Sequence, residues 1–234
     1  MIFSFLNFRY IKIIFDNNIS APCVFKIVFD DNNIIHVEGG CDPVRDVEII
    51  NLELTISDLE IINNRLEKIE KKAMTTKDSD SLLEVSALKK AKDALEKAIP
   101  LREISFTDDE KLKLKAFQFL TLKPIIYMAN IDESDLALPD NNYVLALKEY
   151  AKNSKVIKMC AKVESELSEL SIEEKEEMLA MLGIKASGLD DLINATYELL
   201  GLKTYFTVGP EEVRAWTFKD GMKAPACAGI IHTD

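Results

Sequence analysis

The sequence predicts an α/β fold in which a partial parallel sheet is interrupted by an antiparallel helical hairpin and followed by a small β-rich module. Three observations lead to this prediction. A short apolar run at 122–130, LKPIIYMAN, precedes a helical segment at 140–153 and a second apolar run at 155–160. Apolar residues recur at steps of three and four over 52–98, and turn signals divide 203–234. Strand, helix and strand in succession are typical of a parallel sheet.

The helical hairpin is predicted over 47–100 from two apolar stripes. A polar break, TTKDSD (75–80), separates them. The stripes consist of Leu52, Ile56, Leu59, Ile62, Leu66, Ile69 and Ala73, and of Val85, Leu88, Ala91, Leu95 and Ala98. Because each stripe needs an apolar partner, an antiparallel pair of coiled-coil type is the simplest arrangement. Its charged faces are either solvated or a surface for a partner.

Local signals define the later elements. Thr107 followed by Glu110 is a capping box, so a helix is expected within 106–120. Helices are expected at 172–181 and 187–200, with Gly183 and Gly201 as their stops. Turn signals at 209–210 and 220–221 make residues 203–234 a β-rich module.

Composition limits the classes of function. The chain has 234 residues, 47% of them hydrophobic, which is enough for one good core or a medium domain with accessory pieces. The net charge of −11 and the pI of about 4.8 argue against general DNA binding, although a local basic patch could still bind RNA. The apolar first 20 residues carry Arg9, Lys12 and Asp16, so no membrane span is predicted.

The cysteines indicate a protein of a reducing compartment, and the small number of histidines argues against a metal site built from histidines. Only His36 and His232 could supply imidazole ligands. The four cysteines have no CxxC or metal-like spacing, and we expect free thiols in a cytoplasmic protein. They are Cys23, Cys41, Cys160 and Cys227.

Polar residues follow both predicted parallel strands. Asn130 and Glu133 stand three residues apart where the first strand should end, and Cys160 ends the second. Ligands of parallel sheets gather at the carboxyl ends of strands. GTPases read guanine with a strand-terminal Asn-Lys-x-Asp, and Asn130-Ile131-Asp132-Glu133 differs from that motif at two positions. A solvated polar loop is the alternative interpretation.

Four segments in order resemble the YchF/Obg-like ATPase family, a branch of the Obg-related P-loop NTPases. They are HVEGGCDPVRDVEIINLEL (36–54), LTLKPIIYMANIDE (120–133), CAKVESEL (160–167) and residues 201–234. The resemblance implies a nucleotide-binding domain at 28–46 and 101–202, a coiled-coil insertion at 47–100 and a partial TGS domain at 203–234. A divergent N-terminal segment, 1–27, precedes them. The family prefers ATP over GTP and associates with the ribosome.

The resemblance also assigns a base site. Asn130, Ile131, Asp132 and Glu133 match the family's Asn-x-x-Glu motif, except that family members usually carry Asn where this chain has Asp132. Guanine offers N1–H and a 2-amino group to a carboxylate, whereas the N1 acceptor of adenine would repel it. Lengthening Asp to Glu moves that carboxylate by one methylene, which can remove guanine's paired contacts. Cys160, Ala161 and Lys162 match the last nucleotide motif, in which a small residue lets the backbone approach the base.

The motifs for the phosphates are missing. Neither GxxxxGK[ST] nor DxxG occurs in the sequence, so the groups that hold phosphates and Mg²⁺ in the family are absent and no catalytic residue is predicted. We therefore expect a fragment of a ribosome-associated ATPase that is inactive alone. The alternative is a non-catalytic remnant or interaction module that binds a ribosomal or protein partner.

Overall fold

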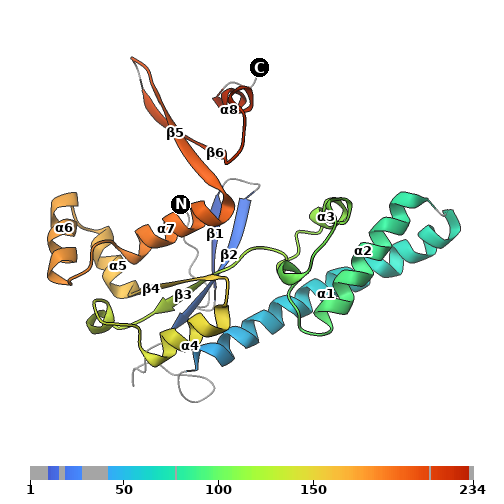
Figure 1. Cartoon of the computed structure of the whole chain (residues 1–234), viewed down its shortest axis with the longest axis horizontal. Coiled ribbons are helices and arrows are strands. Elements are labelled where there is room, and N and C mark those ends of the chain that lie inside the picture. The colour runs from blue at the N-terminus through green and yellow to red at the C-terminus, as the bar shows by residue number, and fades with distance from the viewer. Residues whose placement is uncertain (1–9, 16–18, 28–41, 77, 211, 232–234) are drawn as a thin grey trace. The chain divides into compact units, whose positions relative to one another are not determined.

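The computed structural model describes residues 10–15, 19–27, 42–76, 78–210 and 212–231. Figure 1 shows its helices and strands. The helices are α1 (Pro43–Thr76), α2 (Ser79–Leu95), α3 (Asp108–Lys115), α4 (Asn142–Ala151), α5 (Ala161–Ser168), α6 (Ile172–Met181), α7 (Gly188–Leu200) and α8 (Ala224–Ile231). The strands are β1 (Tyr10–Phe15), β2 (Ile19–Ile27), β3 (Ile126–Asn130), β4 (Lys155–Met159), β5 (Leu202–Val208) and β6 (Val213–Lys219).

The chain divides into two compact units. The first comprises residues 1–130 and 140–156, and the second comprises 131–139 and 157–234. The part of the predicted nucleotide-binding domain at 28–41 lies outside the described residues. Within the part of the chain that the structure describes, no helix has the length and apolar character needed to cross a membrane.

A four-stranded sheet in the order β1-β2-β3-β4 gives the chain its α/β character. β2 pairs with β3 in parallel, from Cys23 opposite Ile126 to Ile27 opposite Asn130. Every residue of β3 is buried, as expected for an inner strand of a parallel sheet. β1 pairs antiparallel with β2, so residues in the predicted divergent segment 1–27 contribute two strands.

Helices α1 and α2 form a helical pair (Figure 1), and its apolar core also includes Leu101, Phe106, Leu114 and Phe119 of the following segment. α1 begins at Pro43, four residues before the predicted hairpin, because the Asp42 carboxylate accepts hydrogen bonds from the amides of Val44 and Arg45. The core contains Ile62, Leu66, Ile69, Ala87, Leu88, Ala91, Ala94 and Leu95. The Arg65 guanidinium also holds the Glu84 carboxylate of α2 with two hydrogen bonds, of 2.6 and 3.1 Å.

A buried carboxylate near the middle of α1 fixes this helix to the segment that leads into β3. Asp58 is fully buried and accepts hydrogen bonds from the amides of Leu120 (2.9 Å) and Thr121 (2.7 Å). The Thr121 hydroxyl donates a third, of 2.6 Å. Hydrogen bonds to a charged acceptor are stronger than neutral ones, so this contact ties the helical pair firmly to the chain before the sheet.

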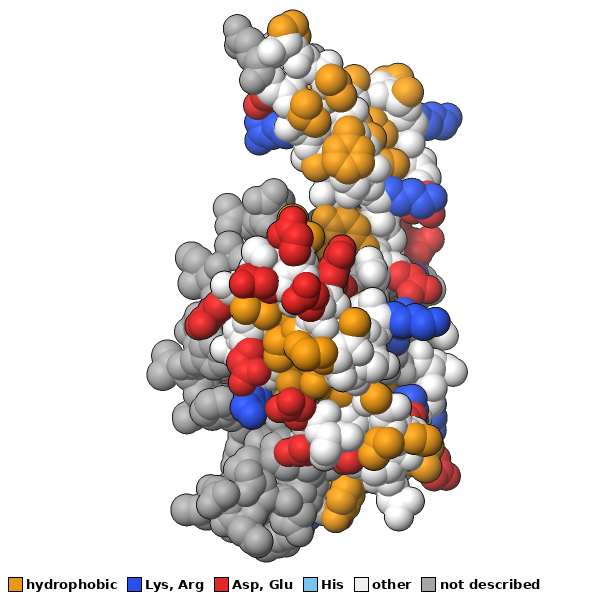
Figure 2. All heavy atoms as spheres, turned by 90° about the vertical axis from the view of Figure 1, so that its left-hand side faces the viewer, with side chains coloured by type: hydrophobic (Ala, Val, Ile, Leu, Met, Phe, Trp, Pro, Cys, Tyr) orange, Lys and Arg blue, Asp and Glu red, His pale blue; other side chains and the backbone are white. Residues whose placement is uncertain are grey.

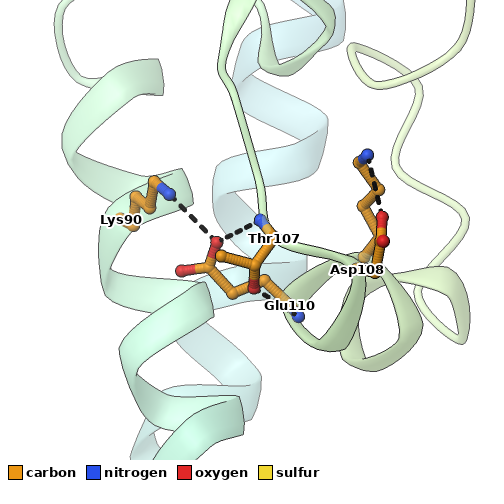
Figure 3. Close-up of polar contacts among 5 residues, drawn as sticks. Lys90, Thr107, Asp108 and Glu110 are labelled. Carbon is orange, nitrogen blue, oxygen red and sulfur yellow. Dashed lines mark hydrogen bonds and ion pairs between the residues drawn. The ribbon is translucent and has the colours of Figure 1, made fainter.

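The capping box predicted at Thr107 and Glu110 is present at the start of α3. The Thr107 hydroxyl accepts from the Glu110 amide, and the Glu110 carboxylate accepts from the Thr107 amide. Lys90 of α2 donates to the same carboxylate at 3.0 Å (Figure 3). These donors hold the pKa of Glu110 below its usual value, with the Thr107 amide as the main cause. α3 ends at Lys115, earlier than the predicted span, and Gln118 beyond it has a positive φ of 51°.

Replacing Thr107 with Ala should cost about 1 kcal/mol of stability, because the Glu110 amide loses its acceptor. Thr107→Ser should keep most of that stability, since its hydroxyl can make the same bond. Urea unfolding followed by circular dichroism compares the two variants with the parent. Equal midpoints for Thr107→Ala and Thr107→Ser would contradict the capping role.

In the second unit, α5, α6 and the loop at 131–139 share a small apolar core. Cys160, Val163 and Leu167 form its buried part, and Leu136 and Leu179 pack against them. Gly183 (φ 70°) and Gly201 (φ 60°) adopt left-handed backbone at the ends of α6 and α7, which confirms both predicted stops.

Residues 202–231 form a hairpin and a helix. β5 and β6 pair antiparallel, and the turn predicted at 209–210 joins them. The turn predicted at 220–221 leads instead into helix α8, where more β-structure was expected; that expectation was wrong. The Tyr205 hydroxyl of β5 donates to the Cys227 carbonyl of α8 at 2.9 Å, so α8 lies against one hairpin face. The other face exposes Phe206, Val208 and Val213.

Candidate functional site

The loop after β3 is joined to the end of β4 by a backbone contact. The Ile131 amide donates to the Met159 carbonyl at 2.8 Å. The Ile131 side chain is fully buried, and Cys160, the residue before α5, is buried as well. Three of the seven predicted site residues, Asn130, Ile131 and Cys160, are therefore buried.

Glu133 and Lys162 bring the two predicted motifs together. The Lys162 ammonium lies 3.3 Å from a Glu133 carboxylate oxygen and 3.9 Å from one of Glu166. The hydrogen bond to Glu133 and its charge raise the pKa of Lys162. Because this ion pair is exposed, water screens it and a ligand can replace either partner. Ala161, between Cys160 and Lys162, is also exposed and carries only a methyl group.

Asp132 shapes the loop. Its carboxylate accepts from the Ser134 amide (3.0 Å) and the Ser134 hydroxyl (2.9 Å) and caps a short 3₁₀ helix at Glu133–Asp135. These bonds, the amide first, lower the pKa of Asp132. Lys158 donates to the Leu138 carbonyl at 2.6 Å and steadies the far side of the loop. Asn130 is buried at the carboxyl end of β3.

Glu164 is a site-supporting residue that sequence reasoning missed. Its carboxylate accepts from the Gly188 amide at 2.6 Å, at the start of α7, 24 residues away. The Leu189 amide and the Ser187 hydroxyl also hold it, but burial outweighs them and raises its pKa. The sequence did indicate where α7 starts, because serine is a typical N-cap residue. In the structure the Ser187 hydroxyl accepts a hydrogen bond from the Asp190 amide. Nothing local marked Glu164 as its partner.

Neutralising Glu164 should not harm stability at neutral pH. The pKa of Glu164 is raised in the folded state, so its protonation stabilises the fold at pH values below the ordinary carboxyl pKa. That stabilisation is lost as the pH rises through the folded-state pKa. Glu164→Gln keeps an acceptor without the charge, so at pH 7.5 its stability should match or exceed that of the parent. Towards pH 4.5 the stability of the parent should rise relative to that of Glu164→Gln. Glu164→Ala removes the acceptor and should be weaker throughout. Urea midpoints from Trp216 fluorescence test this, and a parent advantage that grows with pH would contradict it.

The described residues fit a base better than phosphates or a metal. An exposed carboxylate, an ammonium and a methyl-sized residue stand together at Glu133, Ala161 and Lys162. No cluster of three or more His, Cys, Asp or Glu side chains suited to a metal occurs among the described residues.

Comparisons with known proteins agree with the sequence resemblance. Residues 202–234 match the family model YchF-GTPase_C, described as a protein of unknown function (DUF933). The chain is 49% identical over 219 residues to the ribosome-binding ATPase YchF of Bacillus subtilis, covering 92% of this chain and 60% of the relative. It is 38% identical over 212 residues to the Obg-like ATPase 1 of Pongo abelii, covering 88% of this chain and 53% of the relative.

A solved structure shows the same architecture. The YchF GTPase of Schizosaccharomyces pombe superposes with a TM-score of 0.78 at 34% identity, over 90% of this chain and 58% of that one. The chain thus spans between about half and two thirds of the length of these relatives. Sequence identity, the family model and the shared fold agree, and the chain belongs to the YchF/Obg-like ATPase family.

Proposed function

We propose that this chain is part of a ribosome-associated, nucleotide-binding ATPase and that it supplies the pocket for the adenine base of ATP. The Glu133–Lys162 contact carries the base assignment, because it joins one residue of each predicted base motif within the second compact unit. The names of the relatives, ribosome-binding ATPase and Obg-like ATPase, support the wider function. ATP preference and ribosome association are inferences for this chain.

The ion pair gives a physical reason for preferring adenine. Guanine needs a carboxylate that can accept from N1–H and the 2-amino group together, so it would have to displace Lys162 from Glu133. Adenine offers one 6-amino donor and an N1 acceptor, which a carboxylate and an ammonium side by side can satisfy. The exposed methyl of Ala161 lets a flat base approach the first turn of α5. In this arrangement the buried Ile131 supports the loop, and Asp132 sets its shape.

Base choice is measured by titrating the chain with ATP and GTP and observing ligand signals by saturation-transfer NMR. We expect millimolar affinity, because contacts to a base alone must offset the loss of translational freedom. ATP should bind more tightly than GTP, and Glu133→Ala should reduce that difference. Glu149→Ala, an exposed carboxylate on α4, is the matched control. GTP binding tenfold tighter, about 1.4 kcal/mol, would overturn the adenine assignment.

Hydrolysis should be absent from the chain as it stands. Phosphoryl transfer depends on groups that position the phosphates and Mg²⁺, and the sequence has no phosphate loop. Purified chain should release no phosphate above a heat-treated control. Turnover that disappears on Glu133→Ala would refute this expectation.

The remaining assignments are part of the same proposal. We infer that α1 and α2 correspond to the family's coiled-coil insertion and residues 203–234 to part of a TGS domain, in a cytoplasmic protein. Co-sedimentation with purified ribosomes tests the association, and loss of pelleting at moderate salt would indicate a mainly electrostatic contact. An interaction module without nucleotide is the second candidate, and the exposed surface of α6 favours it.

A further inference from the structure

Helix α6 has a large unpartnered face. None of its residues is fully buried, and it is held mainly through Met178 and Leu179, which pack against Cys160, Val163 and Leu167. A capping box at Ser171 and Glu174 fixes its start. The helix is therefore well defined, although most of its surface faces outward in the described part of the chain.

The outward face combines an acidic strip with apolar flanks. At 3.6 residues per turn, Glu173, Glu176 and Glu177 project on the side away from the packed residues, and Ile172 and Met181 lie on either side of them. Ile172 is 73% exposed and Met181 81%. Ile172 and Met181 are nine positions apart, which is about 13 Å along the helix.

The loop at 131–139 lies beside the end of α6. The Ala137 Cβ lies 3.5 Å from where a Cβ on Gly183 would stand, so the loop that carries Leu138 comes close to the end of this helix. Leu138 is 55% exposed. Figure 2 shows apolar side chains exposed among Asp and Glu side chains on this side of the molecule.

Nearby lysines do not neutralise the acidic strip of α6. Residues 161–182 contain seven glutamates and two lysines, a formal charge of −5. Lys162 is already shared by Glu133 and Glu166. Glu173, Glu176 and Glu177 form no ion pair with any residue that the structure describes. Their combined field attracts cations, while Ile172, Met181 and Leu138 remain to be covered by apolar groups.

We propose that this face binds a basic amphipathic segment of a protein. The α6 docking face consists of Leu138, Ile172, Glu173, Glu176, Glu177 and Met181. Lysine or arginine side chains of the segment pair with the acidic strip, and its apolar side chains cover Ile172 and Met181. The proposal rests on the proposed ribosome association only in naming the ribosome as the source of the segment. It assigns this contact to protein, because unpaired carboxylates repel the phosphates of RNA.

The first experiment uses the full chain and a synthetic helical peptide of leucine and lysine, with a fluorescent label, in an anisotropy titration at 150 mM salt. The charge variant changes Glu173, Glu176 and Glu177 to Lys, and a second version changes them to Gln, which perturbs α6 less. The matched control changes three exposed acidic residues of the other unit, Glu60, Asp93 and Asp109, to Lys. Circular dichroism checks that each variant is folded.

We expect the charge variant to bind the peptide at least tenfold more weakly and the Gln version at least threefold, with the control within threefold of the parent. Ile172→Ser with Met181→Ser should also weaken binding, and its loss should persist at 0.5 M salt because it is apolar. Equal losses in the charge variant and the control would show non-specific attraction and overturn the proposal. Unchanged binding by the charge variant would also overturn it.

The second experiment separates the docking face from the proposed ribosome association. Parent chain and charge variant are sedimented with purified ribosomes, with the peptide or protein-free ribosomal RNA as competitor. Pelleting that the variant loses and the peptide prevents supports a protein partner on the ribosome. Pelleting that the variant retains, or that RNA alone prevents, refutes it. A parent that does not pellet refutes the ribosome association, and the peptide titration still decides whether the docking face exists.

Discussion

Asp58→Ala should lower the stability of the first unit by about 3 kcal/mol or more. The Asp58 carboxylate is fully buried and accepts from the Leu120 amide, the Thr121 amide and the Thr121 hydroxyl. Removing it leaves the buried amide and hydroxyl of Thr121 and the part-buried amide of Leu120 without their acceptor, and each unsatisfied buried group costs about 1–3 kcal/mol. Asp58→Asn keeps one oxygen acceptor and should lose less.

Hydrogen exchange can locate this effect. The amides of Leu120 and Thr121 should exchange faster in Asp58→Ala, together with α1 around residue 58, because the contact joins these segments across 62 and 63 residues of sequence. Glu60→Ala is the matched control, an exposed carboxylate two residues along the same helix. It should change stability by less than about 0.5 kcal/mol. Similar losses in both variants would show that Asp58 has no special role.

Gly188→Ala should destabilise the second unit by about 2–3 kcal/mol, although alanine is ordinarily the better helix residue. A Cβ at Gly188 would overlap the Met159 Cβ, which leaves no room unless the end of β4 or the start of α7 moves. It would also lie 3.2 Å from the Glu164 carboxylate oxygen that the Gly188 amide holds. Because Met159 directly precedes Cys160, this shift should also weaken the proposed ATP binding.

Gly229→Ala provides the control for this substitution. Gly229 lies in α8 without a positive φ, and apart from its chain neighbours and the backbone of its own helix nothing lies within 4 Å of an added Cβ. It should be neutral or stabilising by up to about 1 kcal/mol. Thermal unfolding and hydrogen exchange over 155–164 and 187–192 compare the two variants. Comparable melting temperatures would contradict the close packing at Gly188.

Several elements could be predicted because their signals are local. The capping box at Thr107 and Glu110 acts across three residues, and the stops at Gly183 and Gly201 depend on backbone conformation at one residue. α6 occupies 172–181, the range that was predicted before the stop at Gly183. In contrast, α5 was not predicted, and α8 replaced expected β-structure. Short helices such as these give weak periodic signals, and packing decides between helix and strand.

By itself the sequence determined the family, and it predicted the helical hairpin, the strands at 126–130 and 155–159, and two base motifs at 130–133 and 160–162. Each of these is written in residues that are close together along the chain. Only the tertiary structure decided that β1 and β2 join the sheet, that Glu133 meets Lys162, and that Asp58 holds Thr121. The Glu164 contact with Gly188 is of the same kind. These contacts join residues 24 to 63 positions apart, and they form only when the packed chain brings those residues together, so no local pattern specifies them.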